Sequence, residues 1–103
     1  KSPSPLSLIN NSSNSHLSTL DLSDNSFDSS IYNWLFNLTS SSSLVKLYLV
    51  GNLLTGPIPD AFGNITSLSR LSLANNQLQG VIPKSFGNLC NLKELYLRWN
   101  NFS

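Results

Sequence analysis

Residues 44–67 read LVKLYLVGNLLTGPIPDAFGNITS, and the next 24 residues, 68–91, read LSRLSLANNQLQGVIPKSFGNLCN. Aligned without gaps, the two segments are identical at 11 of 24 positions, so they are two copies of one unit. The shared positions are Leu44/Leu68, Leu47/Leu71, Leu49/Leu73, Asn52/Asn76, Leu54/Leu78, Gly56/Gly80, Ile58/Ile82, Pro59/Pro83, Phe62/Phe86, Gly63/Gly87 and Asn64/Asn88. The same frame extends back to Leu17 and forward to Phe102, so one period governs residues 17–103.

The repeated core LxxLxLxxN begins at Leu17, Leu44, Leu68 and Leu92, with spacings of 27, 24 and 24 residues. Such a core at this period is typical of a leucine-rich repeat solenoid. Leucines alternate with other residues within each core, which predicts a strand with one buried face. No copy can bury its leucines alone, so the copies must stack with their strands parallel. We expect an α/β-type leucine-rich repeat solenoid, mostly β and irregular with little α, with a parallel sheet on its concave side and about three and a half repeats.

The period divides the chain into five parts: 1–16, 17–43, 44–67, 68–91 and a truncated repeat, 92–103. The first part is either a linker or the remnant of a degenerate earlier repeat. Repeat 17–43 is three residues longer than the next two and contains a serine run at 40–43, which we expect to bulge out as a flexible loop. Trp34 is expected to pack along the outer surface or under this insertion.

One asparagine recurs where each predicted strand ends. Its amide supplies donors and an acceptor, so it can satisfy backbone groups that the turn removes from the sheet. These four residues form a predicted structural ladder: Asn25, Asn52, Asn76 and Asn100. After each turn, glycine permits backbone geometry closed to other residues and proline fixes an extended return path. The residues concerned are Gly56, Gly80, Pro59 and Pro83, followed by Phe62 and Phe86 as the outer wall over a short 3₁₀ turn.

Composition argues against several function classes. Only 11% of residues are charged and the net charge is +1, which gives no basic footprint for nucleic acid or an anionic membrane. The longest apolar run, 44–54, is too short to span a bilayer and contains Lys46, so no membrane insertion is expected from this segment. The single cysteine, Cys90, excludes an internal disulfide and a multi-cysteine metal site, and we expect it to be a small buried hydrophobe.

Catalysis finds little support in the sequence. The one histidine, His16, lies in a Ser/Asn-rich stretch without a predicted partner. The acidic residues fall at different repeat offsets, so they do not suggest paired carboxylates: Asp21, Asp24, Asp28, Asp60 and Glu94. The first three are close in sequence, but they lack the loop glycine and closing Glu of a calcium site. The kinase glycine-rich loop, catalytic loop and DFG motif are absent. We predict no enzyme activity, no cofactor and no metal.

The segments NLLTGPIPDAFGNITS and NQLQGVIPKSFGNL resemble the plant-specific leucine-rich repeat with its LxGxIP element, found in ectodomains of receptor-like kinases and receptor-like proteins. The segment LDLSDNSFDSSIYNWLFNLTSSSSL looks more narrowly like receptor-like proteins of the disease-resistance type. The resemblance implies a domain on the extracellular side of the plasma membrane or in the apoplast, signalling through partner kinases. The sequence shows no signal peptide, paired-cysteine cap, C-terminal cap or membrane anchor, so we expect a segment of a longer receptor or a truncated gene product.

Residues between the strand leucines should face solvent on the concave sheet and align laterally from repeat to repeat. The aligned rows run through Lys46, Tyr48 and Val50, then Arg70, Ser72 and Ala74, then Glu94, Tyr96 and Arg98, with Trp99 extending the last. Aromatic residues with arginines are the types that anchor protein and peptide interfaces. The competing interpretation is that Tyr48 and Tyr96 only cover the sheet, which their β-propensity would favour.

Five asparagines fit the N-glycosylation pattern Asn-x-Ser/Thr: Asn10, Asn11, Asn37, Asn64 and Asn101. With this much Asn and Ser, roughly three would occur by chance, so position matters more than number. Asn37 and Asn64 share one repeat offset on the predicted outer side, away from the concave strands.

We therefore predict a recognition module for a protein or peptide ligand, with a co-receptor kinase as a further partner. The alternative is a secreted enzyme inhibitor resembling the polygalacturonase-inhibiting proteins, which use the same plant-type repeat to block a microbial hydrolase. Regular 24-residue repeats fit both functions, whereas the 27-residue first repeat fits the receptor-like proteins better.

Overall fold

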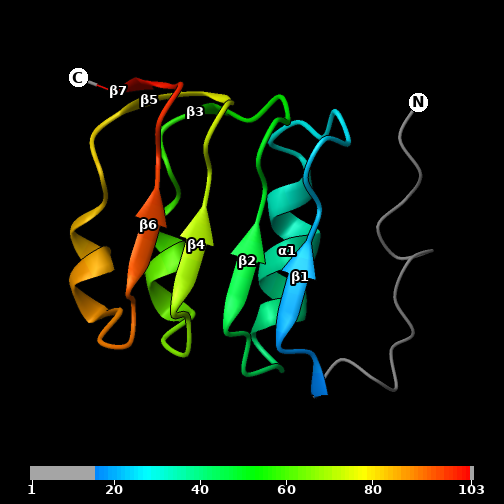
Figure 1. The fold of residues 1–103 in the computed structure, drawn as a ribbon, viewed down its shortest axis with the longest axis vertical. Coiled ribbons are helices and arrows are strands. Elements are labelled where there is room, and N and C mark those ends of the chain that lie inside the picture. The colour runs from blue at the N-terminus through cyan, green and yellow to red at the C-terminus, as the bar shows by residue number, and fades with distance from the viewer. Residues whose placement is uncertain (1–15, 103) are drawn as a thin grey trace.

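The computed structural model describes residues 16–102, which form a stack of repeats measuring 40 × 35 × 18 Å overall. One sheet has four strands, which lie side by side in Figure 1 and which we call the main sheet. They are parallel, in the order β1 (Thr19–Asp21), β2 (Lys46–Tyr48), β4 (Arg70–Ser72) and β6 (Glu94–Tyr96). A second parallel sheet along one edge contains β3 (Thr55–Gly56), β5 (Gln77–Gly80) and β7 (Asn101–Phe102). The return segments contain α1 (Ile31–Thr39) and the 3₁₀-helices η3 (Asp60–Asn64) and η4 (Lys84–Asn88).

The core is the stack of leucines between the main sheet and these helices. Equivalent leucines are lateral partners across the sheet, as Leu47 is to Leu71 and Leu71 to Leu95. Leu47 and Leu71 are completely buried, and each such side chain contributes roughly 1.5–3 kcal/mol before conformational entropy is subtracted. The predicted solenoid of parallel strands, with little α-helix, is confirmed.

The asparagine amides connect each repeat to the one before it. Asn76 Nδ2 donates to the carbonyls of Leu49 and Leu73 at 2.9 and 3.1 Å, and its Oδ1 accepts from the Leu54 amide at 3.1 Å. Asn52 is buried like Asn76, and its Oδ1 accepts from two backbone amides of the first repeat. These are the backbone groups that the predicted amides were expected to satisfy.

The return path after each turn follows the Gly and Pro positions. Gly56 and Gly80 have φ of +75° and +85°, where a side chain would be strained. Pro59 and Pro83 are extended, with ψ of 142° and 143°, and each directly precedes a 3₁₀-helix. The predicted 3₁₀ turns are confirmed, and Phe62 of η3 is fully buried.

The first repeat differs from the prediction, because its return segment is a nine-residue α-helix followed by a compact turn. Ile31, Leu35 and Leu38 are buried at helical spacing, so α1 has one apolar face on the core. The three extra residues do not form a flexible loop: Ser41 and Ser42 each donate a side-chain hydrogen bond to the Leu38 carbonyl and close the helix end. No glycine or proline interrupts the segment, so its helical period can extend over more than two turns.

Hydrogen bonds order the turn before α1, and one aromatic side chain of the helix packs on the core. The Asp28 carboxylate accepts from the side chain and backbone amide of Ser30, and these bonds lower the pKa of that carboxyl. Trp34 is partly buried and packs against the core, whereas the sequence predicted packing along the outer surface or under the insertion.

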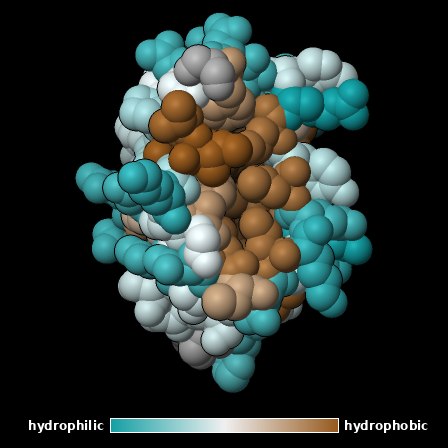
Figure 2. Space-filling view, turned by 90° about the vertical axis from the view of Figure 1, so that its left-hand side faces the viewer, coloured by the Kyte–Doolittle hydropathy of each residue, from teal (hydrophilic) through white to brown (hydrophobic). Residues whose placement is uncertain are grey.

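Figure 2 shows the face at the η4 and β6 end of the stack, where apolar side chains form a continuous strip between polar ones. The core-type leucines of the last repeat, Leu92, Leu95 and Leu97, are only partly buried there. Cys90 is exposed, so its predicted burial was wrong. Its neighbour Leu89 fills the core position, while Cys90 lies in the turn after η4. Within residues 16–102, no helix has the length and apolar character needed to cross a bilayer.

Candidate recognition surface

The strand register brings the predicted binding rows together on the exposed side of the main sheet. Lys46 lies beside Arg70, which lies beside Glu94. The next row runs from Tyr48 through Ser72 to Tyr96. This lateral alignment follows from the 24-residue period, and the sequence predicted it correctly.

Two of the predicted solvent-facing residues are buried instead. Ser72 is 4% exposed and Ala74 is 5% exposed. Ser72 is small and lies between the lateral partners Tyr48 and Tyr96, so the larger neighbours shield it from solvent. Any contact surface on this face is therefore built from the longer side chains around these two positions.

An ion pair crosses the middle of the surface. Arg70 Nε and Glu94 Oε1 are 2.8 Å apart, and both side chains remain partly exposed. A hydrogen bond to Tyr48 and the nearby charge of Glu94 raise the pKa of Arg70 above its ordinary value. The pair mutually neutralises two of the predicted binding residues, so the free charges on this face lie to either side of it.

The C-terminal corner carries the most exposed aromatic residues of this face. Trp99 and Tyr96 are 66% and 44% exposed, and the Arg98 guanidinium carbon lies 4.6 Å from the centre of the Trp99 ring. We call Tyr96, Arg98 and Trp99 the recognition corner. A cation over an indole face is a favourable contact that holds both side chains in place.

Trp99 also has a strained backbone, with φ of +61°. The equivalent residues of the earlier repeats have the same left-handed geometry but are Asp24, Gly51 and Asn75, with φ of +59°, +71° and +56°. Gly, Asn and Asp tolerate this region, whereas a bulky residue there is an outlier costing roughly 1–2 kcal/mol. The strain was missed from the sequence, although Asp, Gly and Asn at one repeat offset were the available signal.

The glycosylation candidates lie away from the exposed face of the main sheet. Asn37 is on α1, Asn64 is the last residue of η3, and Asn101 is in β7; all three are exposed. Asn10 and Asn11 lie outside the described residues. Among residues 16–102, no group of three or more His, Cys, Asp or Glu side chains could hold a metal ion.

Parallel strands joined by buried asparagines and returned through short helices define a repeat solenoid. A family model described as leucine rich repeat matches residues 42–102, and a second model of that description matches residues 16–38. The chain therefore belongs to the leucine-rich repeat family.

Three solved plant structures show what the chain is similar to. A plant ice-binding protein is 33% identical over 85% of this chain and 28% of its own, with a TM-score of 0.69. The ectodomain of the Arabidopsis thaliana membrane receptor kinase GASSHO1/SCHENGEN3, in complex with CASPARIAN STRIP INTEGRITY FACTOR 2, is 30% identical over 81% of this chain and 12% of its own, with a TM-score of 0.65. The plant peptide hormone receptor RGFR1, in complex with RGF2, is 26% identical over 85% and 18%, with a TM-score of 0.65.

The chain thus spans between 12% and 28% of the length of these three structures. A comparison with curated proteins gave no match.

Proposed function

We propose that the chain is a non-catalytic recognition module that binds a protein or peptide on the exposed face of the main sheet. Two of the similar structures are plant receptors in complex with a partner, and one of them is a peptide hormone receptor, which supports this class of function. The LxGxIP segments favour the plant-type repeat, and the long first repeat favours a receptor-like protein of the disease-resistance type. Such a parent would hold the module on the extracellular side of the plasma membrane and signal through a co-receptor kinase.

The observation that carries the proposal is the recognition corner. Trp, Tyr and Arg are the residue types most enriched among interface hot spots, and here one of each is exposed side by side. Backbone strain at Trp99 opposes folding, so its presence calls for a compensating role. The Arg98 contact orients the indole before any partner arrives, which reduces the entropy lost on binding.

The proposal can be tested with a displayed library of random 12-residue peptides selected on the immobilised chain. We expect the selected peptides to bind the Tyr96→Ala/Arg98→Ala variant at least about tenfold more weakly, the change that 1.4 kcal/mol produces. The control is Gln77→Ala/Gln79→Ala, which changes exposed residues of β5 in the second sheet. Undiminished binding to the first variant would place the site elsewhere.

Trp99→Asn gives a second, independent signature. Asn is accepted at the equivalent position 75, so we expect this variant to be more stable by about 1 kcal/mol while it binds the selected peptides more weakly. Thermal unfolding and peptide titration of the same sample measure both effects. A loss of stability would mean that Trp99 has a structural role.

The inhibitor alternative uses the same face, so it must be separated by assay and by gene context. We expect the chain not to inhibit a fungal polygalacturonase, and we expect the flanking genomic sequence to encode a membrane helix. Inhibition together with a secretory leader and no membrane helix would favour the inhibitor.

The similarity to a plant ice-binding protein supports a second candidate function, binding to an ice surface. The second sheet offers exposed, uncharged hydrogen-bonding side chains in two lateral pairs, Thr55 beside Gln77 and Gln79 beside Asn101. Within each pair the strands are separated by the regular spacing of about 4.8 Å. An ice recrystallisation assay tests this, with Gln79→Lys as the disruptive variant. Activity that the lysine abolishes would favour ice binding over peptide recognition.

A further inference from the structure

We propose that Asn64 carries an N-linked glycan whose first sugar lies in the cleft between α1 and η3, against the ring of Phe36. The modification itself rests on the extracellular part of the proposed function, because it requires entry into the secretory pathway. The proposed position of the first sugar is argued from the geometry of the cleft.

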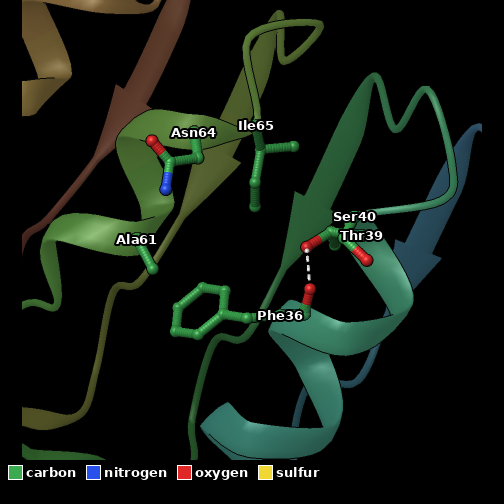
Figure 3. Close-up of a pocket in the computed structure, with 6 residues that line it drawn as sticks. All are labelled: Phe36, Thr39, Ser40, Ala61, Asn64 and Ile65. Carbon is green, nitrogen blue, oxygen red and sulfur yellow. Dashed lines mark hydrogen bonds between the residues drawn. The ribbon is translucent and has the colours of Figure 1, made fainter.

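The cleft has a volume of about 110 Å³ and opens between the end of α1 and η3 (Figure 3). One wall comes from Phe36, Thr39 and Ser40, and the other from Ala61, Asn64 and Ile65. Figure 3 shows Asn64 at the rim, with Phe36, Ala61 and Ile65 pointing into the space between the two helices. A group attached to the Asn64 amide would therefore enter the cleft from its edge.

The first repeat creates this space because its α-helix replaces the 3₁₀-helix of the later repeats. Between η3 and η4 the packing is so close that a Cβ on Gly63 would lie 2.6 Å from the backbone oxygen of Ser85. At the boundary of η3 with α1, Phe62 contacts Tyr32 and Phe36, and the cleft remains beside these rings. Asn64 thus lines the cleft at the boundary of η3 with α1.

The lining of the cleft suits a pyranose ring. Phe36, on one wall, is held by an edge contact with Phe62 and by stacking on Tyr32, with ring centres 5.0 and 5.6 Å away. A fixed aromatic face can pack against the apolar C–H face of a sugar, as aromatic rings do with other apolar groups. On the same wall, the exposed Ser40 hydroxyl donates to the Asn37 carbonyl, which leaves its oxygen able to accept from a sugar hydroxyl.

The pattern Asn64-Ile65-Thr66 is also accessible in the folded chain, since both Asn64 and Thr66 are exposed. At Asn37 the third residue, Thr39, is 8% exposed and its hydroxyl donates to the Phe36 carbonyl. At Asn88 the third residue is Cys90. Of these three equivalent positions, only Asn64 combines an exposed acceptor, an exposed hydroxyl residue and a neighbouring cleft.

The experiment is to secrete the full chain from plant cells behind a leader peptide and to compare three forms. These are the intact glycoprotein, the form trimmed by an endoglycosidase to one sugar, and the Asn64→Gln variant. We expect the variant to lose one glycan in a gel shift, and the trimmed form to retain a Tm about 3 °C or more above that of the variant. Asn37→Gln is the matched control and should leave this Tm difference unchanged.

Phe36→Leu tests the contact between the sugar and the aromatic ring, because it keeps an apolar side chain but removes the ring. We expect the Tm difference between trimmed Phe36→Leu and Phe36→Leu/Asn64→Gln to fall by more than half. No glycan at Asn64 would overturn the proposal, and so would equal Tm values for the trimmed form and the Asn64→Gln variant. Peptide selection on bacterially produced, unglycosylated chain is independent of these results, so failure here is distinguishable from failure of the proposed function.

Discussion

The two helix-to-helix boundaries of the molecule are built differently. Between η3 and η4, two equivalent 3₁₀-helices approach closely over Gly63, and the Ser85 hydroxyl donates to the Asp60 carbonyl at 2.9 Å. Between α1 and η3, a nine-residue α-helix meets a five-residue 3₁₀-helix. Aromatic side chains fill most of that boundary and a cleft remains. We call the first the regular boundary and the second the irregular boundary.

The main sheet shows no such difference. The register of β1 with β2 at the irregular boundary, Thr19 beside Lys46, is the same as that of β2 with β4, Lys46 beside Arg70. A change of three residues in repeat length is therefore absorbed entirely on the helical side. The comparison shows that backbone hydrogen bonds fix the sheet, whereas side-chain packing adapts the opposite side to each repeat.

The largest expected effect tests whether the ladder is equally strong at both boundaries. Asn52 connects the repeats across the irregular boundary and Asn76 across the regular one, and both are buried with several backbone partners. Replacing Asn52 or Asn76 by Ala leaves buried backbone groups unpaired. We therefore expect each substitution to lower the free energy of unfolding by roughly 3 kcal/mol. Chemical denaturation measures this loss.

The control for the ladder is Asn75→Ala. Asn75 is exposed and has a left-handed backbone. The substitution should therefore lower the free energy of unfolding by only roughly 1 kcal/mol, the cost of placing Ala in that conformation. If Asn75→Ala and Asn76→Ala destabilise the chain equally, the ladder does not have the structural role assigned to it.

The next effect concerns close packing at the regular boundary. Gly63→Ala places a methyl group against the Ser85 backbone, and overpacking of this kind costs roughly 1–3 kcal/mol. Gly87 is the equivalent residue in η4, where an added Cβ meets nothing within 4 Å, so Gly87→Ala should be nearly neutral. Thermal unfolding of both variants checks the comparison, and similar losses would show that the boundary is not tightly packed.

The smallest expected effect is an increase in the free energy of unfolding, from a substitution at the irregular boundary. The Tyr32 hydroxyl is buried without a hydrogen-bond partner, so Tyr32→Phe should raise the unfolding free energy by about 1 kcal/mol. Lower stability in the variant would mean that the hydroxyl is satisfied in solution.

Tyr32 also predicts a pH dependence. Burial raises its pKa to about 12 from 10.0. The neutral phenol is favoured in the folded state, so this stability is fully present below pH 10 and is lost as the pH rises from 10 towards 12. Unfolding free energies measured at pH 8 and pH 11 should diverge more for the wild type than for Tyr32→Phe.

The regular part of the fold could be predicted because each core position recurs with the same residue type. Leucines, the ladder asparagines and the Gly and Pro of the return path each specify one local geometry. Helix α1 was missed because the serine run indicated a loop, although Ile31, Leu35 and Leu38 already had helical spacing.

The candidate surface was less predictable, because exposure depends on lateral neighbours. Ser72 is buried between lateral neighbours 24 residues away in sequence, Tyr48 and Tyr96. Packing between strands decides which small residues are covered by large neighbours. The residue pattern of one strand alone therefore does not predict this burial.

The ladder has a mechanical consequence. Its bonds between repeats join residues 22 to 30 positions apart, so each one links a repeat to its immediate neighbour. In a stack joined in this way, small rotations at successive boundaries add along the axis. We expect the molecule to be stiff within each repeat and to bend over its whole length. Bending should be easiest at the irregular boundary, which contains the cleft. Bending there would tilt β1 towards or away from the recognition corner.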